Sequence, residues 1–200
     1  MSTKPARIFA EFLSHLFNPS VFGFLVLLVA ALEEEAQTHP HFLEVLFYAL
    51  LISLFFPLMY TLLLKRLKLI ANFFYSKKKD RLYLFPMILI ILISMLVIIR
   101  HFYASSAVIT YLEMSLVLIA LVAVITPFTK ISLHMTGMTS LFVLCMYLWG
   151  SKGALIGFIL PAVAWSRLYL SQHSAAQVVS GTLVGGSVTL AYLYTIEYLV

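Results

Sequence analysis

The chain has 200 residues, of which 62% are hydrophobic and only 10% are charged, and its formal net charge is +5. Soluble domains carry about 25% charged residues, so this composition excludes an ordinary soluble globular protein and predicts an integral membrane protein. No small-residue cleavage pattern follows the first residues, so we expect no cleavable signal peptide. The single cysteine, Cys145, excludes a disulfide framework and is expected to be a packing residue.

Residues 1–17 combine apolar and charged positions at helical spacing. The polar positions are Lys4, Arg7, Glu11 and His15, and the apolar positions are Ile8, Phe9, Phe12, Leu13, Leu16 and Phe17. This pattern predicts an amphipathic helix that lies at the membrane interface before Asn18 and Pro19 turn the chain inward. The alternative is a simple extension of the first membrane span.

Beyond this helix, long runs with few or no charged residues predict membrane-spanning helices, which need about 20 apolar residues. Seven runs follow one another: Asn18–Leu32, Val45–Leu64, Leu82–Ile99, Ala107–Phe128, Ile131–Trp149, Gly153–Leu170 and His173–Ile196. We therefore expect an all-α polytopic bundle of six to seven spans, forming one transmembrane domain over residues 18–200. A tight turn at residues 150–153 separates the fifth and sixth spans. Arg167 either lies in a helix that continues past it or faces protein at membrane depth.

The basic residues predict the orientation of these spans. With seven crossings, eleven basic residues fall on one side and two on the other. The richer side holds Lys4, Arg7, Lys65, Arg66, Lys68, Lys77, Lys78, Lys79, Arg81, Lys130 and Arg167. Since cytoplasmic loops carry the excess of Lys and Arg, we expect a multi-pass protein of the cell (inner) membrane with these basic loops in the cytoplasm.

Polar side chains at the ends of spans are costly and therefore informative. On the expected cytoplasmic side they lie at residues 77–81, 130–137, 165–167 and 173–181. Lys130 and His134 point the same way if their helix begins by Lys130, and His173, Gln177 and Gly181 share one helix face. Gly181 and Gly185 form a small-xxx-small pattern that lets another helix approach closely. Two imidazoles among Lys and Arg suit an anion, above all phosphate.

These segments resemble two of the three motifs of the type-2 phosphatidic acid phosphatase / vanadium haloperoxidase superfamily. Ser132-x-His134 stands for the family's PSGH motif, and Ser166-Arg167-x5-His173-x3-Gln177-x3-Gly181 stands for SR-x5-H-x3-D-x3-G. The resemblance covers roughly residues 60–190 and is closest to small bacterial integral-membrane members.

The resemblance implies the role of each residue. His173 attacks phosphorus and forms a phosphohistidine, His134 protonates the leaving alcohol, and Gln177 takes the place of the aspartate that holds the nucleophile. The phosphoryl group is held by Arg167, Ser166, Ser132 and Lys130, with Arg81 and Lys79 standing for the first family motif, K-x6-RP. The family needs no metal or other cofactor for hydrolysis, and no Asp/Glu/His cluster here suggests one.

This sequence departs from the family pattern at several positions. Arg81 is not followed by proline, since Pro86 comes five residues later, and Ile131 and Leu133 replace the Pro and Gly of PSGH. The largest departure is Gln177, because an amide oxygen accepts a hydrogen bond but cannot balance an imidazolium charge. In a serine-protease triad the comparable Asp→Asn change costs about 10⁴ in kcat.

Two functions from different classes fit this pattern. The first is a membrane-embedded, metal-independent phosphatase or phosphotransferase acting on a lipid phosphate in the bilayer, with no nucleic-acid partner. The second is a non-catalytic binder or transporter of phosphorylated lipids or anions that uses the same basic pocket. Taken singly, residues 77–81 also fit the positive-inside signal, and each histidine fits an ordinary helix-end position. Glu113 is expected to pair with Arg100 or His101 rather than to act in transport.

Overall fold

The structure is a computed structural model that describes residues 4–18, 21, 24–25, 28, 44, 47–48, 50–70, 78–102 and 106–199. Every element in these ranges is helical. Four helical stretches are long and apolar enough to cross a membrane: Lys79–Arg100, Val108–Ile125, Leu133–Tyr169 and Ala175–Glu197. The expected all-helical membrane class is confirmed at this level. The first expected span lies largely outside the described residues, so the count of six to seven spans stays a prediction.

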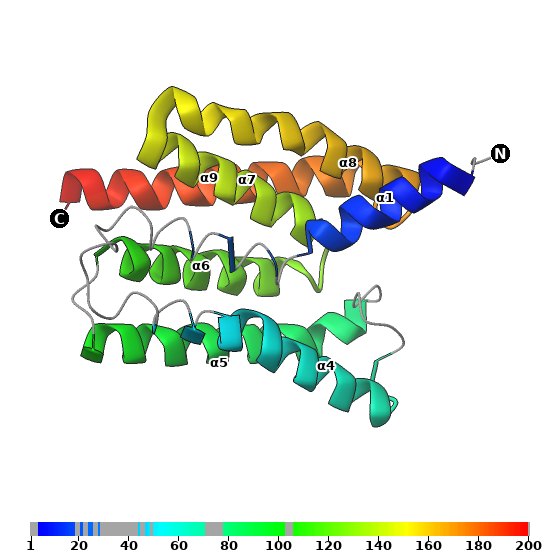
Figure 1. Ribbon diagram of the computed structural model, residues 1–200, viewed down its shortest axis with the longest axis horizontal. Helices are drawn as coiled ribbons and strands as arrows, with labels where there is room; N and C mark the ends of the chain where they lie inside the picture. Colours follow the sequence, from blue (N-terminus) through cyan, green and yellow to red (C-terminus); the bar gives the residue numbers. More distant parts are fainter. Residues whose placement is uncertain are drawn as a thin grey trace. The chain divides into compact units, whose positions relative to one another are not determined.

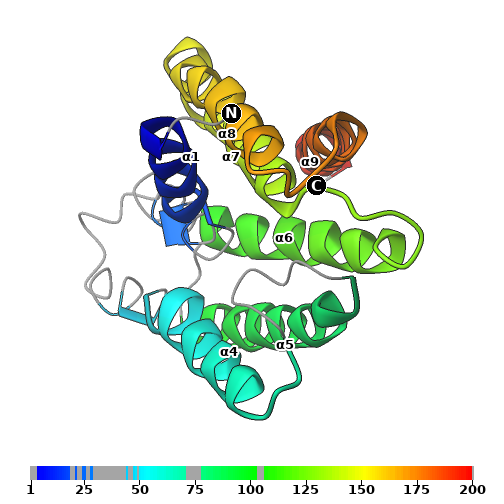
Figure 2. The same ribbon diagram turned by 90° about the vertical axis from the view of Figure 1, so that its right-hand side faces the viewer.

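The chain divides into two compact units, of which the second comprises Gly23–Phe128. Its described elements are a π-helical turn η1 (Leu51–Phe55), α4 (Phe56–Arg66), α5 (Lys78–Phe102) and α6 (Ser106–Ile125). Helices α5 and α6 lie side by side (Figure 2). An ion pair between Arg100 and Glu113 joins them, as expected. Helix α5 begins before the expected span and continues through Pro86, which has no backbone N–H to donate within the helix.

The first unit joins Met1–Phe22 to Thr129–Val200. Its elements are α1 (Lys4–Leu16), α7 (Leu133–Trp149), the 3₁₀-helical η2 (Gly150–Phe158), α8 (Ile159–Tyr169) and α9 (Ala175–Leu199). At the end of α7, Gly150 adopts a φ of +56°, which L-residues with a side chain rarely adopt. The chain reverses there, and η2 and α8 return along α7 (Figure 1). The stretch Leu133–Tyr169 is therefore a hairpin, and the turn expected at residues 150–153 is confirmed.

Two glycines of α9 set its close approach to α7. A Cβ atom at Gly181 would lie 2.6 Å from the Ser132 carbonyl oxygen, and one at Gly185 would lie 2.2 Å from the Thr136 carbonyl oxygen. Both distances are shorter than real Cβ contacts, so only glycine fits at either position. The close helix approach expected from the small-xxx-small pattern is confirmed.

Helix α1 packs on α8 through a face made of Ala10, Leu13 and Ser14. Its large apolar side chains at Ile8, Phe9, Phe12 and Leu16 are exposed. The Phe9 ring also approaches the ring of Trp165 on α8, with 6.0 Å between centroids. The expected amphipathic helix is present and ends at Leu16. Its protein contacts, however, come mainly from its smaller residues, as in membrane helices, where small side chains allow close packing.

Candidate anion site

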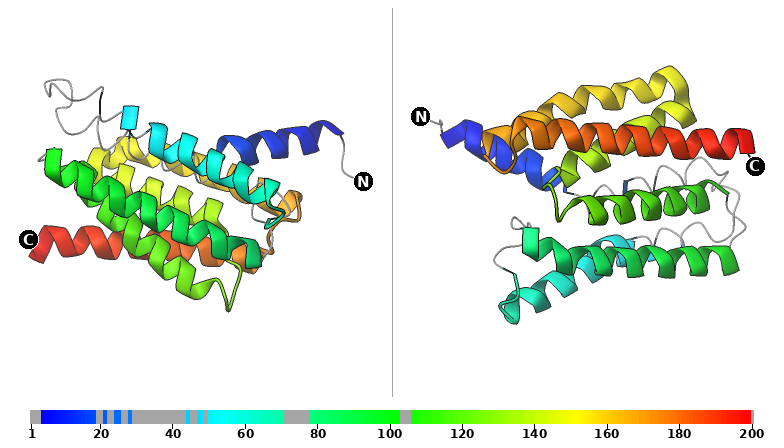
Figure 3. Two further views of the ribbon diagram at one scale, coloured as in Figure 1. Left: turned by 90° about the horizontal axis from the view of Figure 1, so that it is seen from below. Right: turned by 180° about the vertical axis from the view of Figure 1, so that it is seen from behind.

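The start of α7, the end of α8 and the start of α9 meet at one end of the first unit, beside α1 (Figure 3). Two hydrogen bonds join these segments directly. The Ser132 amide donates to the Gln177 carbonyl oxygen over 3.1 Å, and the Lys130 ammonium donates to the Gln172 carbonyl oxygen over 3.2 Å. The fold thus brings to one region all the predicted site residues that belong to this unit.

Ser132 caps the N-terminus of α7. Its backbone is extended, and its hydroxyl accepts from the Met135 amide over 3.5 Å. Because the cap sets the start of the helix at Leu133, Lys130 precedes α7 and does not share a helix face with His134. Lys130 reaches the site instead by its bond to the turn between α8 and α9. The Ser132 hydroxyl therefore has a structural bond in addition to the phosphate-binding role implied for it.

His134 lies one residue into α7 and is 6% exposed. Its Nε2 atom is 3.1 Å from the backbone carbonyl oxygen of Ser14 on α1. A carbonyl oxygen only accepts hydrogen bonds, so Nε2 carries a hydrogen in this contact. The ring therefore presents a donor to the end of α1.

Arg167 lies in the last turn of α8 and faces protein, with 4% of its surface exposed. Helix α8 also continues past Arg167, to Tyr169, so the residue combines a position facing protein with a short continuation of the helix, and its depth in the membrane stays a prediction. Its Nη1 donates to the Ser14 hydroxyl, and its buried Nε has no hydrogen-bond partner among the described residues. The neighbouring Ser166 hydroxyl donates to the Ala10 carbonyl oxygen over 2.8 Å.

Among the described residues of the first unit, no carboxylate forms an ion pair with Arg167. The sequence of this unit contains only two acidic residues, Glu11 and Glu197. Glu11 pairs with Arg7 over 3.0 Å on the exposed face of α1. Glu197 lies near the far end of α9, roughly 30 Å along the helix from Gln177. Burying a guanidinium without an anion is costly, so this unit holds a cation that an anionic ligand would stabilise.

His173 and Gln177 are joined at the start of α9. The His173 Nδ1 atom is 3.0 Å from Gln177 Oε1, and the same oxygen accepts from the Ser174 amide over 3.3 Å. The Ser174 hydroxyl in turn accepts from the Gln177 amide over 3.3 Å. Ser174 and Gln177 thus form a capping box, a motif whose last position is either glutamate or glutamine. Because Oε1 only accepts, Nδ1 carries a hydrogen in this contact, and in the neutral form of the ring the lone pair is then on Nε2.

The turn before α9 positions His173. The Arg167 carbonyl oxygen accepts from the Gln172 amide over 3.1 Å and from the His173 amide over 3.4 Å. Ser171 adopts a φ of +52° within this turn. His173 is 7% exposed as a result, directly after the helix that carries Arg167. The five residues between Arg167 and His173 thus comprise the last two residues of α8 and a three-residue turn.

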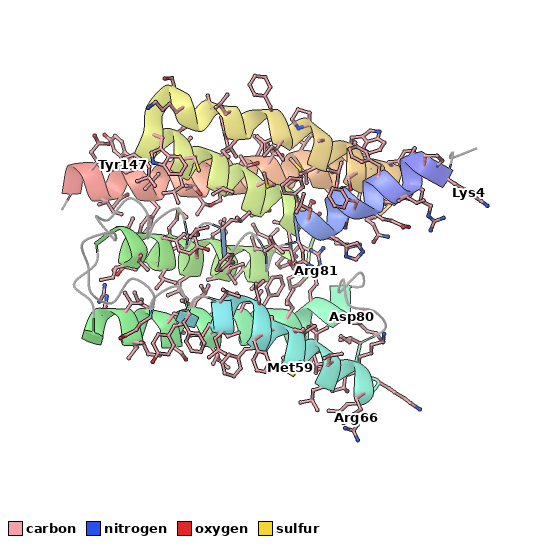
Figure 4. The ribbon with its side chains drawn as sticks, viewed as in Figure 1. Lys4, Met59, Arg66, Asp80, Arg81 and Tyr147 are labelled. Atoms are coloured by element: carbon pink, nitrogen blue, oxygen red, sulfur yellow. The ribbon has the colours of Figure 1, made fainter. Side chains whose placement is uncertain are left out.

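Arg81 and Lys79 belong to the other unit, in the first turn of α5. Figure 4 labels Arg81 and its neighbour Asp80. Arg81 is buried and Lys79 is exposed. Between them, Asp80 is fully buried, and neither of its carboxylate oxygens has a partner among the described residues. Its place in the first turn suits the helix dipole. The phosphate-binding role implied for Arg81 and Lys79 stays a prediction.

Ser14 is the residue that the sequence analysis missed. It contacts both His134 and Arg167, and its signal is the pair Ala10-x-x-x-Ser14, a small-xxx-small pattern within α1. That pattern marks a close helix contact but does not identify the partner helix. No protein-family model, curated protein or solved structure matches the chain.

Proposed function

We propose that this protein is a membrane-embedded, metal-independent phosphatase or phosphotransferase that acts on a lipid phosphate. The observation that carries the proposal is the buried guanidinium of Arg167, which has an unpartnered Nε and no ion pair with a carboxylate among the described residues. A phosphate group fits this cation because the planar fork of arginine matches two phosphoryl oxygens. His134 and Lys130 add donors at the same end of the unit.

The chemistry follows from the two histidines. The neutral His173 ring, with Nδ1 bonded to Gln177, attacks phosphorus through Nε2 while the bond from phosphorus to the alcohol oxygen breaks. His134, as an imidazolium, donates a proton to the leaving alcohol. Water then attacks the phosphohistidine, giving its proton to His134, and releases phosphate and free His173. A phosphotransferase would use an acceptor alcohol in place of this water.

The position of the site favours a lipid substrate. His134 lies at the beginning and Arg167 near the end of the apolar hairpin Leu133–Tyr169, and His173 lies just before the apolar stretch Ala175–Glu197. A phosphate bound there lies at the ends of membrane-spanning helices, where lipid head groups are found, while the acyl chains extend beside the apolar helices. Candidate substrates are phosphatidic acid, phosphatidylglycerophosphate and a polyprenyl phosphate.

The experiment is phosphate release from this panel of lipid phosphates by the purified protein in detergent. We expect release by the wild type with at least one lipid and none by His173→Ala. Ser187→Ala is a matched control, because the exposed Ser187 hydroxyl donates to the Leu183 carbonyl oxygen of its own helix. Equal release by wild type and His173→Ala, or no release from any lipid, contradicts the proposed chemistry.

One observation favours the second candidate, a non-catalytic binder or transporter of phosphorylated lipids. Gln177 is neutral, and its side-chain oxygen is already shared between His173 and the helix cap. Such an oxygen stabilises the imidazolium formed on attack less than a carboxylate does. If the wild type binds lipid phosphates and Arg167→Ala does not, while neither releases phosphate, this second function holds.

A further inference from the structure

The last turns of α1 supply oxygen atoms to the side chains that are proposed to hold and protonate the phosphoryl group. Arg167 donates to the Ser14 hydroxyl, His134 Nε2 contacts the Ser14 carbonyl oxygen, and Ser166 donates to the Ala10 carbonyl oxygen. All five residues are buried at this junction. The three side chains that are proposed to bind or protonate the substrate thus contact oxygen atoms of α1 in this structure.

The end of a helix is suited to stand in for an anion. The last four carbonyl groups have no intrahelical partner, and the helix dipole places partial negative charge there. In α1 the Leu13 carbonyl accepts from the Phe17 amide and the His15 carbonyl accepts from the Asn18 amide. The Ser14 carbonyl, between them, is 3.1 Å from the His134 ring nitrogen.

We propose that the C-terminal turn of α1 is an internal ligand of the anion site, which a phosphate monoester must displace in order to bind. This inference rests on the proposed function and identifies what occupies the site before the substrate does. The Ser14 hydroxyl and carbonyl take the places of two phosphoryl oxygens. Displacement frees Arg167 and His134 for the phosphate and leaves the chemistry at His173 unchanged.

Helix α1 has the surface of a segment that can move without leaving the membrane. It buries only Ala10, Leu13 and Ser14, all on one face. Its exposed side chains include Ile8 at 66% and Phe12 at 57% exposure. Apolar side chains on an amphipathic helix bind the interfacial region of a bilayer, so α1 stays attached there when its small face leaves α8.

The first test compares Ser14→Ala with the control Ser187→Ala. The Ser14 hydroxyl stabilises only the state in which α1 fills the site, so its removal favours the ligand-bound state. A hydrogen bond to a charged group corresponds to about tenfold or more in affinity. We expect Ser14→Ala to bind dioctanoyl phosphatidic acid about tenfold more tightly, and Ser187→Ala to bind it as the wild type does. Weaker binding by Ser14→Ala would mean that Ser14 is a fixed part of the ligand site and would overturn the inference.

The second test holds α1 on α8 without touching the site. The rings of Phe9 and Trp165 are 6.0 Å apart, so Phe9→Cys with Trp165→Cys places two thiols across the contact. Cys145→Ala removes the remaining thiol from this variant. We expect thiol cross-linking to weaken binding at least tenfold, and reduction of the cross-link to restore it. Equal affinity in the cross-linked and reduced forms contradicts displacement of α1.

Inorganic phosphate is measured beside the lipid, since either could supply the anion. Binding of the lipid alone identifies a lipid phosphate, whereas equal binding of inorganic phosphate identifies a phosphate site without lipid selectivity. If the wild type releases phosphate but Ser14→Ala binds the lipid more weakly, only the inference about α1 is overturned. Binding with the expected effects at Ser14 but without release overturns only the phosphatase. Binding of neither probe to any variant overturns both.

Discussion

Replacement of Gly185 by alanine should separate α7, which carries His134, from α9, which begins just after His173. The added Cβ atom would lie 2.2 Å from the Thr136 carbonyl oxygen and 2.9 Å from its carbonyl carbon. Because these are backbone atoms, no side-chain rotation relieves the contact, and α7 and α9 must move apart by about 1 Å to restore an ordinary contact.

Gly186 provides a matched control on the same helix. A Cβ atom there would meet only the Thr139 methyl group, at 3.3 Å. Both replacements gain about 1 kcal/mol of helix propensity, which cancels when the two variants are compared. The difference in their free energies of unfolding is then the overpacking cost at Gly185, about 1–3 kcal/mol.

The same separation should impair the site. The Ser132 amide is bonded to the Gln177 carbonyl over 3.1 Å, so a shift of α7 away from α9 breaks the contact that aligns their starts. A misplacement of about 1 Å can cost about 100-fold in rate. Unfolding in one detergent and phosphate release, measured on both variants, test this reasoning. Equal stability and equal release for Gly185→Ala and Gly186→Ala would refute it.

Three further predictions follow from the topology and from the start of α9. Lys78→Cys should react with thiol reagents only from the cytoplasm, and Gln37→Cys only from outside. Labelling of Lys78→Cys in intact cells by an impermeant reagent would contradict the predicted orientation. Gln177→Asp should raise single-turnover phosphate release, because a carboxylate stabilises the charged His173 ring better than an amide does. If Gln177→Asp instead binds lipid phosphate more weakly and shows no turnover, the binding function is favoured. Ser174→Ala should lower the stability by about 1 kcal/mol through loss of the cap, which thermal unfolding in detergent measures, and an unchanged unfolding temperature would show that this cap is dispensable.

The sequence predicted the parts of the fold that depend on local rules. Gly150 ends α7 because its positive φ suits glycine, and Gly181 and Gly185 lie against α7 because no other residue fits there. Glu113 pairs with Arg100, one of the two partners expected for it, because a charged group in apolar surroundings needs a polar contact. Each of these inferences needed only the spacing of residues and the cost of an unsatisfied group.

The contact between α1 and the site could not be predicted in the same way. Large apolar residues define the amphipathic pattern of α1, but apolar burial does not drive helix association within a membrane, so the pattern does not reveal the face that packs. Small residues at Ala10 and Ser14 make that contact. The cap at Ser132 likewise makes α7 begin at Leu133, after Lys130, so Lys130 is not on the helix face that carries His134. The second role of Gln177, in capping α9, could be predicted from the sequence, since Ser174-x-x-Gln177 matches a capping box.

The most direct test of the central claim is detection of a phosphohistidine at position 173. Radiolabelled phosphatidic acid is mixed with excess enzyme, the reaction is quenched in alkali within a turnover, and the labelled peptide is identified by mass spectrometry. We expect acid-labile phosphate on His173 in the wild type, a larger amount in Gln177→Asp, and none in His173→Ala. Absence of label from wild type and Gln177→Asp under conditions where both bind the lipid, or label on another residue, would contradict this claim.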